Sequence, residues 1–208
     1  RRQRQMCIRD RDIRFLNNAI ALRFITTKYD LNELTMDLTR YIRSIPDFPE
    51  PGIIFRDITP LLLNQECFRY CVKEFSKRSR AITPDLIVGI ESRGFIFGSA
   101  LAYEMNLPFV PIRKAGKLPF SIEEIEYDLE YGSDTLQIHS DALKPHQRVV
   151  LVDDLIATGG TLQASRLLVE KMGGDVVGIN SVIVLKEICP VEILQDEALF
   201  YLVDFSLE

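Results

Sequence analysis

Residues 149–162, with the sequence VVLVDDLIATGGTL, constrain the fold of this chain more than any other segment. The segment begins with four apolar residues, and two adjacent carboxylates, Asp153 and Asp154, come next. A continuous apolar run is typical of a strand buried on both faces of a sheet. The loop that follows consists of Ala157, Thr158, Gly159, Gly160 and Thr161. Apolar side chains at helical spacing begin at Leu162, so the segment predicts a strand that ends in two carboxylates, followed by a loop that opens a helix.

This arrangement indicates an anion-binding site. Ligands of open α/β sheets bind beyond the carboxyl ends of the strands. Gly159 and Gly160 lack a Cβ atom, so backbone N–H groups can close around a phosphate, and a helix N-terminus adds partial positive charge. The paired acids point to vicinal hydroxyls, a metal ion or a developing positive charge. Neither G-x-G-x-x-G nor G-K-[ST] occurs, which disfavours a dinucleotide fold and a P-loop.

Other segments alternate between strand and helix patterns, which predicts a parallel α/β sheet. Buried strands are expected at 86–90, 109–112, 149–152, 176–185 and 199–205, and helices at 31–45, after Asn64, at 94–105 and after Gly160. The polar residues 113–134 are expected to form a long excursion with a hairpin, and a loop of that length is usually functional.

The chain has 208 residues and a formal net charge of −5, which fits one domain and disfavours a nucleic-acid-binding protein. No apolar stretch approaches the ~20 residues of a membrane helix. Residues 1–14 contain six Arg and two Asp, so the remainder is more acidic than the average. We expect residues 1–30 to be a disordered or non-native extension and residues 31–208 to be a single domain. The four cysteines form no C-x-x-C pair and are expected to be free thiols of a reduced, cytoplasmic protein.

The loop segment resembles the phosphoribosyl-diphosphate (PRPP) motif of type I phosphoribosyltransferases. Four more segments occur in the order that the adenine-specific members of this family have: PGIIFRD at 51–57, ESRGF at 91–95, RKAGKLP at 113–119 and LEYG at 129–132. The resemblance covers residues 38–207. It implies the type I phosphoribosyltransferase fold, a mainly parallel twisted sheet flanked by helices with a flexible hood. It also implies transfer of the 5-phosphoribosyl group from PRPP to adenine, giving AMP and diphosphate.

The resemblance also implies roles for individual residues. Asp153 and Asp154 would hold the ribose hydroxyls, and residues 157–161 the 5′-phosphate. The diphosphate would be bound by Arg93, Arg113, Lys114 and Lys117. Adenine would be read by Ile54, Phe55 and Arg56, through backbone groups near Ile54 and Arg56 and the ring of Phe55. Glu130 would be the general acid/base, and Tyr131 of the hood would close over the substrate.

Further expectations follow from the same resemblance. Mg²⁺ would act mainly through substrate and water oxygens, without direct protein ligands, and the protein would be a homodimer. The peptide bond between Glu91 and Ser92 is often cis in this family. Two alternatives stay open: an enzyme of the same fold that uses another purine, and a PRPP-sensing regulator, for which the N-terminal ~37 residues are too short to hold most nucleic-acid-binding modules.

Overall fold

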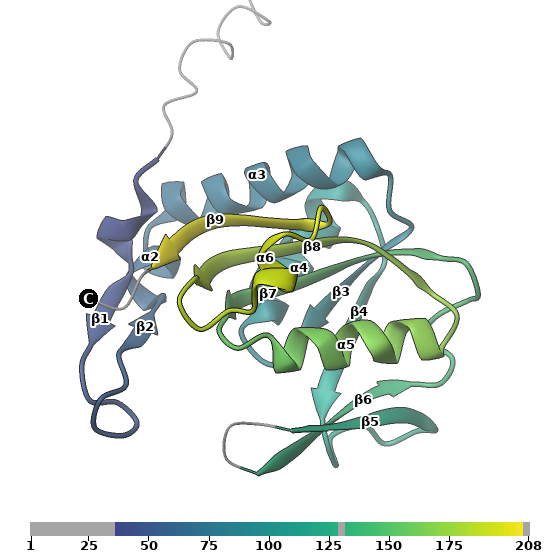
Figure 1. Ribbon diagram of the computed structural model, residues 1–208. Helices are drawn as coiled ribbons and strands as arrows, with labels where there is room; N and C mark the ends of the chain where they lie inside the picture. Colours follow the sequence, from purple (N-terminus) through teal and green to yellow (C-terminus); the bar gives the residue numbers. More distant parts are fainter. Residues whose placement is uncertain (1–35, 129–131, 206–208) are drawn as a thin grey trace, which may run out of the picture. The chain divides into compact units, whose positions relative to one another are not determined.

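The computed structural model describes residues 36–128 and 132–205, and the chain from Leu38 onward forms one compact unit. Within the described residues, this unit is built on a seven-stranded sheet of order β5-β6-β4-β3-β7-β8-β9 (Figure 1). The strands are β3 (Leu86–Ile90), β4 (Phe109–Lys114), β5 (Ile122–Asp128), β6 (Ser133–His139), β7 (Arg148–Ile156), β8 (Asp175–Leu185) and β9 (Leu199–Phe205). The five strands β4, β3, β7, β8 and β9 run parallel to one another. At the edge of the sheet, β6 pairs antiparallel with β4, and β5 pairs antiparallel with β6. The expected mainly parallel α/β fold is confirmed.

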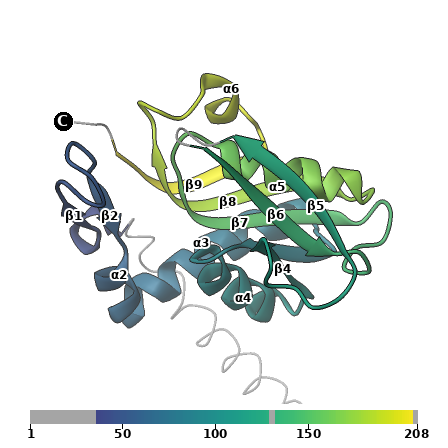
Figure 2. The ribbon, with the colours of Figure 1, turned by 90° about the horizontal axis from the view of Figure 1, so that it is seen from below.

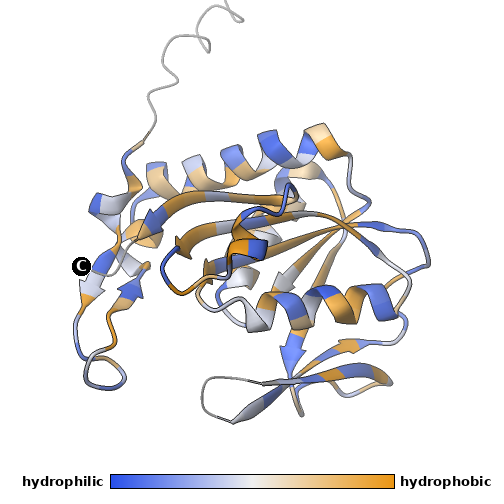
Figure 3. Cartoon of the chain, in the orientation of Figure 1, coloured by the Kyte–Doolittle hydropathy of each residue, from blue (hydrophilic) through white to orange (hydrophobic). Residues whose placement is uncertain are grey.

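Helices cover both faces of the parallel strands. Figures 1 and 2 show α3 (Gln65–Ile82) and α4 (Gly94–Met105) on one face and α5 (Gly160–Lys171) on the other. Two short helices, α2 (Thr59–Leu63) and α6 (Val191–Leu194), complete the layers. Helices on both faces leave little of the central strands exposed to water, and every residue of β3 is buried. Figure 3 shows the resulting concentration of hydrophobic residues in the central strands.

The order of the strands creates a switch point. The chain passes from β3 through α4 to β4 in one direction along the sheet, and from β7 through α5 to β8 in the other. Because β3 and β7 are neighbours, the loops at their carboxyl ends diverge and leave room for a ligand between them. The predicted anion site therefore lies at the position where such sheets bind ligands.

Several local predictions are confirmed. Asn64 caps α3, and its Oδ1 accepts hydrogen bonds from the N–H groups of Glu66 and Cys67, each at 3.0 Å. The predicted bounds of the strand 86–90, the helix 94–105 and the strand 199–205 match those of β3, α4 and β9. The peptide bond between Glu91 and Ser92 is cis.

The helix predicted at 31–45 is wrong in its described part. Residues Leu38–Tyr41 form a short 3-10 helix, η1, and Arg43–Ile45 form strand β1, which pairs antiparallel with β2 (Phe55–Asp57). Ile45 precedes Pro46, and a residue before proline is pushed out of the α region into extended conformations. The apolar residues that suggested a helix include Leu38, at the start of η1, and Ile42, directly after it, and both are buried.

Strand β7 runs further than its apolar core predicts. It continues through the two acids to Ile156, because β8 keeps pairing with it from Asp153↔Ser181 to Ile156↔Val184. The strand was expected to end at the two acids, but both lie inside it, and the bend comes after residue 156.

The predicted hairpin exists as the strands β5 and β6, which we call the hood hairpin. It packs against α5, and the Lys171 ammonium of that helix lies 2.8 Å from the Glu123 carboxylate. Glu123 therefore has a cation partner that is distant in sequence. Residues 129–131 at the tip lie outside the described residues, as does the expected boundary between residues 30 and 31.

Within residues 36–128 and 132–205, no helix is long and apolar enough to cross a membrane. Cys67, Cys71 and Cys189 are buried free thiols. Burial raises the pKa of each, to about 12 for Cys71. None of the three is therefore an activated nucleophile.

Candidate active site

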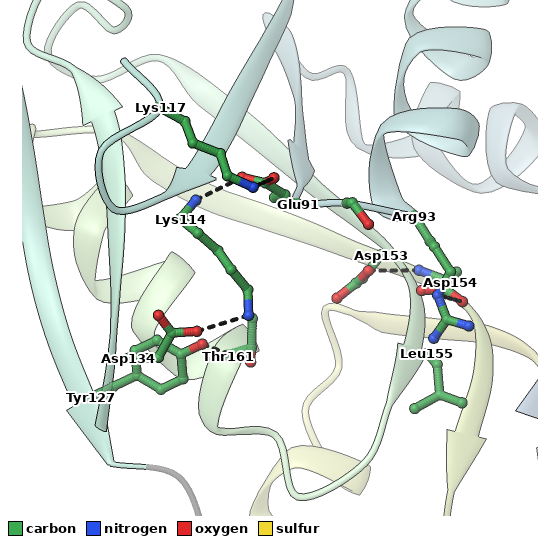
Figure 4. A pocket seen from close by; sticks show the side chains of 11 residues that line it. Glu91, Arg93, Lys114, Lys117, Tyr127, Asp134, Asp153, Asp154, Leu155 and Thr161 are labelled. Atoms are coloured by element: carbon green, nitrogen blue, oxygen red, sulfur yellow. Dashed lines mark hydrogen bonds and ion pairs between the residues drawn. The ribbon is translucent and has the colours of Figure 1, made fainter. Parts of the chain in front are cut away.

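A cleft of about 410 Å³ opens at the carboxyl ends of β3 and β7. Figure 4 shows the side chains that line it. Those used below are Glu91, Arg93, Lys114, Lys117, Tyr127, Asp134, Asp153, Asp154 and Thr161. They come from the β3–α4 turn, from β4 and its loop, from the hood hairpin, and from β7 and the start of α5. The cleft thus gathers residues from four stretches that are far apart in the sequence.

The acid pair lies on the floor of this cleft. Asp154 is only 3% exposed, and its Oδ2 lies 3.0 Å from Nε of Arg93. That oxygen accepts no hydrogen bond from the described residues, so the contact is an ion pair without hydrogen-bond geometry. Burial raises the pKa of Asp154, although Arg93 opposes the rise. Burial, and then the neighbouring carboxylate, raise the pKa of Asp153 well above its usual range.

The start of α4 lies unusually close to the acid pair. A Cβ atom at Gly94 would lie 2.5 Å from the backbone oxygen of Val152 and 3.1 Å from Oδ1 of Asp153. Only glycine therefore allows α4 to approach β7 here. This contact explains why glycine follows Arg93, and it sets the distance between Arg93 and the acids.

The loop 157–161 forms a second cavity of about 220 Å³, next to the first. Gly159 has a φ of 80° and is the residue that precedes α5. A Cβ atom there would lie 2.1 Å from Cδ1 of Ile193 in α6. The positive φ favours glycine by itself, and a larger residue would also have to displace the Ile193 side chain, so α6 packs against this loop. The helix N-terminus beside this cavity favours an anion.

Glu91 was not predicted as a site residue, yet it organises one side of the cleft. Its carboxylate accepts hydrogen bonds from Arg113 Nε at 3.1 Å, from the Lys114 backbone N–H at 2.8 Å and from Lys117 Nζ at 2.5 Å. Burial alone would raise its pKa, but these three donors lower it to about 2. Glu91 is therefore a fixed anion that holds two of the predicted diphosphate cations.

Lys114 lies apart from Arg113 and Lys117. Its ammonium extends to the hood hairpin, where Nζ lies 2.9 Å from Oδ2 of Asp134 (Figure 4). The hydrogen bond that Lys114 donates to Asp134 raises the pKa of Lys114 and lowers the pKa of Asp134. Beside them, the Tyr127 hydroxyl lies 3.2 Å from the Thr161 hydroxyl. Neither Tyr127 nor Asp134 was predicted as a site residue.

The predicted base-binding segment lies in and before strand β2. The Phe55 ring packs edge-on against Phe48, and the Arg93 guanidinium carbon lies 5.3 Å from the ring centre of Phe55. The Arg56 side chain points elsewhere. It is buried, donates to Ser44 Oγ, and lies 4.1 Å from the ring centre of Phe205. The Arg56 side chain is therefore engaged within the fold, and any contact of Arg56 with a base would have to come from its backbone.

Most predicted residues thus come together. The acid pair, the loop 157–161 and the four cations line or border the two adjoining cavities, and every one of these cations is ion-paired with a carboxylate. Glu130 and Tyr131 lie outside the described residues. Glu91 could have been found as the acid beside Arg93 in the ESRG segment. Nothing in the local sequence around Tyr127 or Asp134 identified them.

Within the described residues, no group of three or more carboxylate, histidine or cysteine side chains could hold a metal ion. A magnesium ion carried mainly by substrate and water oxygens fits this donor set, because such an ion needs few or no protein ligands. A protein cage for the ion does not fit it.

A family model described as a phosphoribosyl transferase domain matches residues 61–196, and this match gives the class of protein to which the fold and the cleft belong. Its matched part includes the acid pair, the loop 157–161 and the residues of the cleft from Glu91 onward. An adenine phosphoribosyltransferase of Nostoc punctiforme is 50% identical over 82% of this chain and the whole of the relative. The chain therefore belongs to the phosphoribosyltransferase family, among the adenine phosphoribosyltransferases.

Solved structures agree with this assignment. The adenine phosphoribosyltransferase of Thermoanaerobacter pseudethanolicus has a TM-score of 0.77 and 46% identity, and the match covers 81% of this chain and 98% of that one. The Saccharomyces cerevisiae enzyme has a TM-score of 0.75 and 36% identity, and the match covers 80% of this chain and 97% of that one. That structure is a complex with adenine and D-DIAB, an imino-altritol bisphosphate.

Proposed function

We propose that this protein transfers the 5-phosphoribosyl group from PRPP to adenine, giving AMP and diphosphate, a purine salvage reaction. The observation that carries the proposal is the cleft itself, in which a buried acid pair and a glycine loop at a helix N-terminus adjoin at the switch point of the sheet. The high identity to adenine phosphoribosyltransferases supports the same reaction.

The acid pair would act on the sugar. Attack at the ribose C1 passes through a cation with oxocarbenium character, as in other glycosyl transfers. Ionised carboxylates of Asp153 and Asp154 would accept hydrogen bonds from the ribose hydroxyls and would stabilise that charge electrostatically. The guanidinium of Arg93 opposes the effect of burial on the pKa of Asp154 and so favours its charged form.

The anionic groups of PRPP would bind on either side of the sugar. Backbone N–H groups and hydroxyls of residues 157–161 would cradle the 5′-phosphate. Arg93, Arg113, Lys114 and Lys117 would neutralise the leaving diphosphate. Each of these cations is paired with a carboxylate, and its remaining N–H donors would be available to phosphate oxygens.

The purine would lie at the β2 side of the cleft. A backbone C=O and N–H near Ile54 and Arg56 would read the donor and acceptor edge of adenine, and Phe55 would pack on its face. Glu130 would transfer a proton at the purine nitrogen, and Tyr131 would close over the substrate. Mg²⁺, carried by substrate and water oxygens, would supply charge neutralisation on the diphosphate.

We also propose a homodimer and a cytoplasmic location. Ile96 and Tyr103 lie on α4 with 38% and 90% of their surfaces exposed, so they would be available for contact with a second copy. Sedimentation velocity of the full chain tests the proposal, because a monomer at micromolar concentration would contradict it.

The decisive experiment is a Mg²⁺-dependent assay with PRPP and adenine, hypoxanthine, guanine or xanthine in parallel. Conversion of adenine in clear preference to the others is expected. A preference for another base would make the protein a different purine phosphoribosyltransferase. Turnover of no base, together with DNA or RNA binding near physiological salt, would favour a regulator instead.

A second assay addresses Glu130. The variant Glu130→Gln keeps the size of the side chain but cannot accept or release the proton. It should lower kcat by about 10²–10⁴-fold and leave the affinity for PRPP within a few-fold of wild type. If both fall together, the acid/base role is wrong.

A further inference from the structure

The turn that follows β4 carries Lys117 to the cleft, yet little of the protein packs around it. Ala115, Gly116 and Lys117 are all exposed. Gly116 has a φ of 78°, and a Cβ atom there would meet nothing within 4 Å beyond its neighbours in the chain. The position of this turn therefore depends on its hydrogen bonds more than on close packing.

Two of these hydrogen bonds join the turn to β6 of the hood hairpin. The Ala115 N–H donates to the backbone oxygen of Thr135 at 3.1 Å, and the Gly116 N–H donates to Oε1 of Gln137 at 3.0 Å. The first bond lies between backbone atoms and needs no particular side chain. The second bond requires the Gln137 side chain, so the choice of residue at position 137 decides how firmly the turn is held.

The Gln137 amide is itself fixed by a second partner. Gln137 is only 7% exposed and lies directly opposite Glu124 in the ladder of β5 and β6. Its Nε2 donates to Oε2 of Glu124 at 2.8 Å. Because an N–H group faces Oε1 and a carboxylate faces Nε2, only one orientation of the amide satisfies both partners. The side chain therefore presents its oxygen to the turn in a defined position.

Lys117 is held at both of its ends. Its backbone follows the turn that Gln137 binds, and its Nζ donates to Oε1 of Glu91 at 2.5 Å. Lys117 lines the cleft (Figure 4), and two of its three ammonium protons remain for a ligand. Gln137 does not line the cleft. It can therefore influence a ligand there only through the turn.

We propose that Gln137 is a positioning residue, which fixes the turn after β4 through the Gly116 N–H and so holds the Lys117 ammonium where diphosphate binds. The proposal rests on the proposed function only in assigning Lys117 to the diphosphate. The hood hairpin thus contributes to diphosphate binding through a side chain that does not touch the ligand.

The test is titration calorimetry of the full-length Gln137→Met variant with inorganic diphosphate and, separately, with ribose 5-phosphate, at constant Mg²⁺. Methionine is close to glutamine in size but cannot accept the Gly116 N–H. Loss of this hydrogen bond should weaken diphosphate binding by about threefold to tenfold. Ribose 5-phosphate, which the loop 157–161 would bind, should keep its affinity within about twofold of wild type and so reports that the variant is folded.

Gln147→Met is the matched control. Oε1 of Gln147 also accepts a backbone N–H, that of Lys144, at 2.8 Å. Gln147 directly precedes β7, at the end of that strand opposite the cleft. The control variant loses the same kind of hydrogen bond and should bind both ligands like wild type. An equal loss of diphosphate affinity in the two variants would overturn the proposal.

Two double variants separate positioning from a general effect on the hairpin. Because Gln137 acts through Lys117, Gln137→Met should cause no further loss of diphosphate affinity in a Lys117→Met background. The exchange of Glu124→Gln together with Gln137→Glu keeps an oxygen for the Gly116 N–H and reverses only the donor and the acceptor of the second hydrogen bond. This exchange should bind diphosphate like wild type.

Unchanged diphosphate affinity in Gln137→Met overturns the proposal, as does an equal loss for both ligands. A loss that persists in Lys117→Met, no recovery in the exchange variant, or a wild type that fails to bind diphosphate also overturns it. A wild type that binds diphosphate more tightly than Gln137→Met, but converts no purine, overturns the proposed function alone.

Discussion

Arg93 and Asp154 form an ion pair, with Nε 3.0 Å from Oδ2, that joins the turn after β3 to the carboxyl end of β7. The same guanidinium lies 5.3 Å from the ring centre of Phe55. Arg93 thus contacts both the predicted ribose-binding acid and the predicted base-stacking ring. Its position depends on the close approach of α4 to β7, which the glycine at position 94 permits.

Replacement of Asp154 by asparagine should lower activity strongly. Asn keeps the shape of the side chain but removes the charge that would stabilise the sugar cation, and it leaves Arg93 without its counter-charge. We expect kcat to fall by about tenfold to a thousandfold, with a higher KM for PRPP, in steady-state assays. Asp175→Asn, at an exposed position at the amino end of β8, should behave like wild type. Normal kinetics of Asp154→Asn would contradict the role of the acid pair.

Glu91 should make the stability of the protein depend on acidic pH. Its pKa is about 2 in the folded protein against 4.5 ordinarily, so the unfolded chain binds more protons between these values. The stabilisation is present above pH 4.5 and is lost as the pH falls toward 2. Glu91→Gln should lower the free energy of unfolding at pH 7 by about 1–2 kcal/mol, a range that allows for solvent screening of half-exposed Lys117.

Urea denaturation at a series of pH values measures this effect. The difference between wild type and Glu91→Gln should shrink steadily between pH 4.5 and pH 2. Glu104→Gln, at an exposed glutamate of α4, serves as the control and should leave the profile unchanged. A constant difference at all pH values would show that lost packing, and not the charge of Glu91, is responsible.

Gly159→Ala should disable the phosphate loop. The new Cβ atom would clash with Ile193, and alanine at a φ of 80° costs about 1–2 kcal/mol by itself. We expect the variant to lose at least tenfold in AMP affinity, visible as loss of the thermal stabilisation by AMP that wild type should show. Gly173→Ala has a similar φ of 82° but only ordinary contacts near Pro145, so it should lose stability and keep AMP binding. Equal effects of both variants on AMP would contradict this interpretation.

Phe205 should affect adenine binding from a distance. Its ring lies 4.1 Å from the guanidinium carbon of Arg56, whose backbone is predicted to read the base. Phe205→Ala removes this cation–π contact and should raise the KM for adenine by about threefold to tenfold, with little change for PRPP. The control is Tyr201→Ala. Tyr201 lies on β9, as Phe205 does, and its ring makes a similar contact with the Lys186 ammonium. An increase for PRPP alone would show that β9 does not position the base segment.

Features that depend on neighbours in the sequence were predicted well. The cap at Asn64, the buried strand β3 and the helix α4 follow from capping chemistry, apolar runs and helical spacing within short stretches. The glycine loop of residues 157–161 was also evident, because its backbone requirements are local. The helix expected at 31–45 failed where pairing with β2 and the following proline outweighed the apolar spacing.

The sequence by itself determined the parallel α/β class, the acid pair and the phosphate loop, because the pattern that predicts each of them lies within a short continuous segment of the chain. The tertiary structure decided which charges meet. Glu91 holds Lys117, 26 positions away, Lys114 turns instead to Asp134, and Tyr127 reaches Thr161. These pairs depend on the order of strands and on the folding of the hood hairpin over α5. Such long-range contacts leave no periodic signal in the chain, because their energy comes from elements that become neighbours only when the sheet assembles.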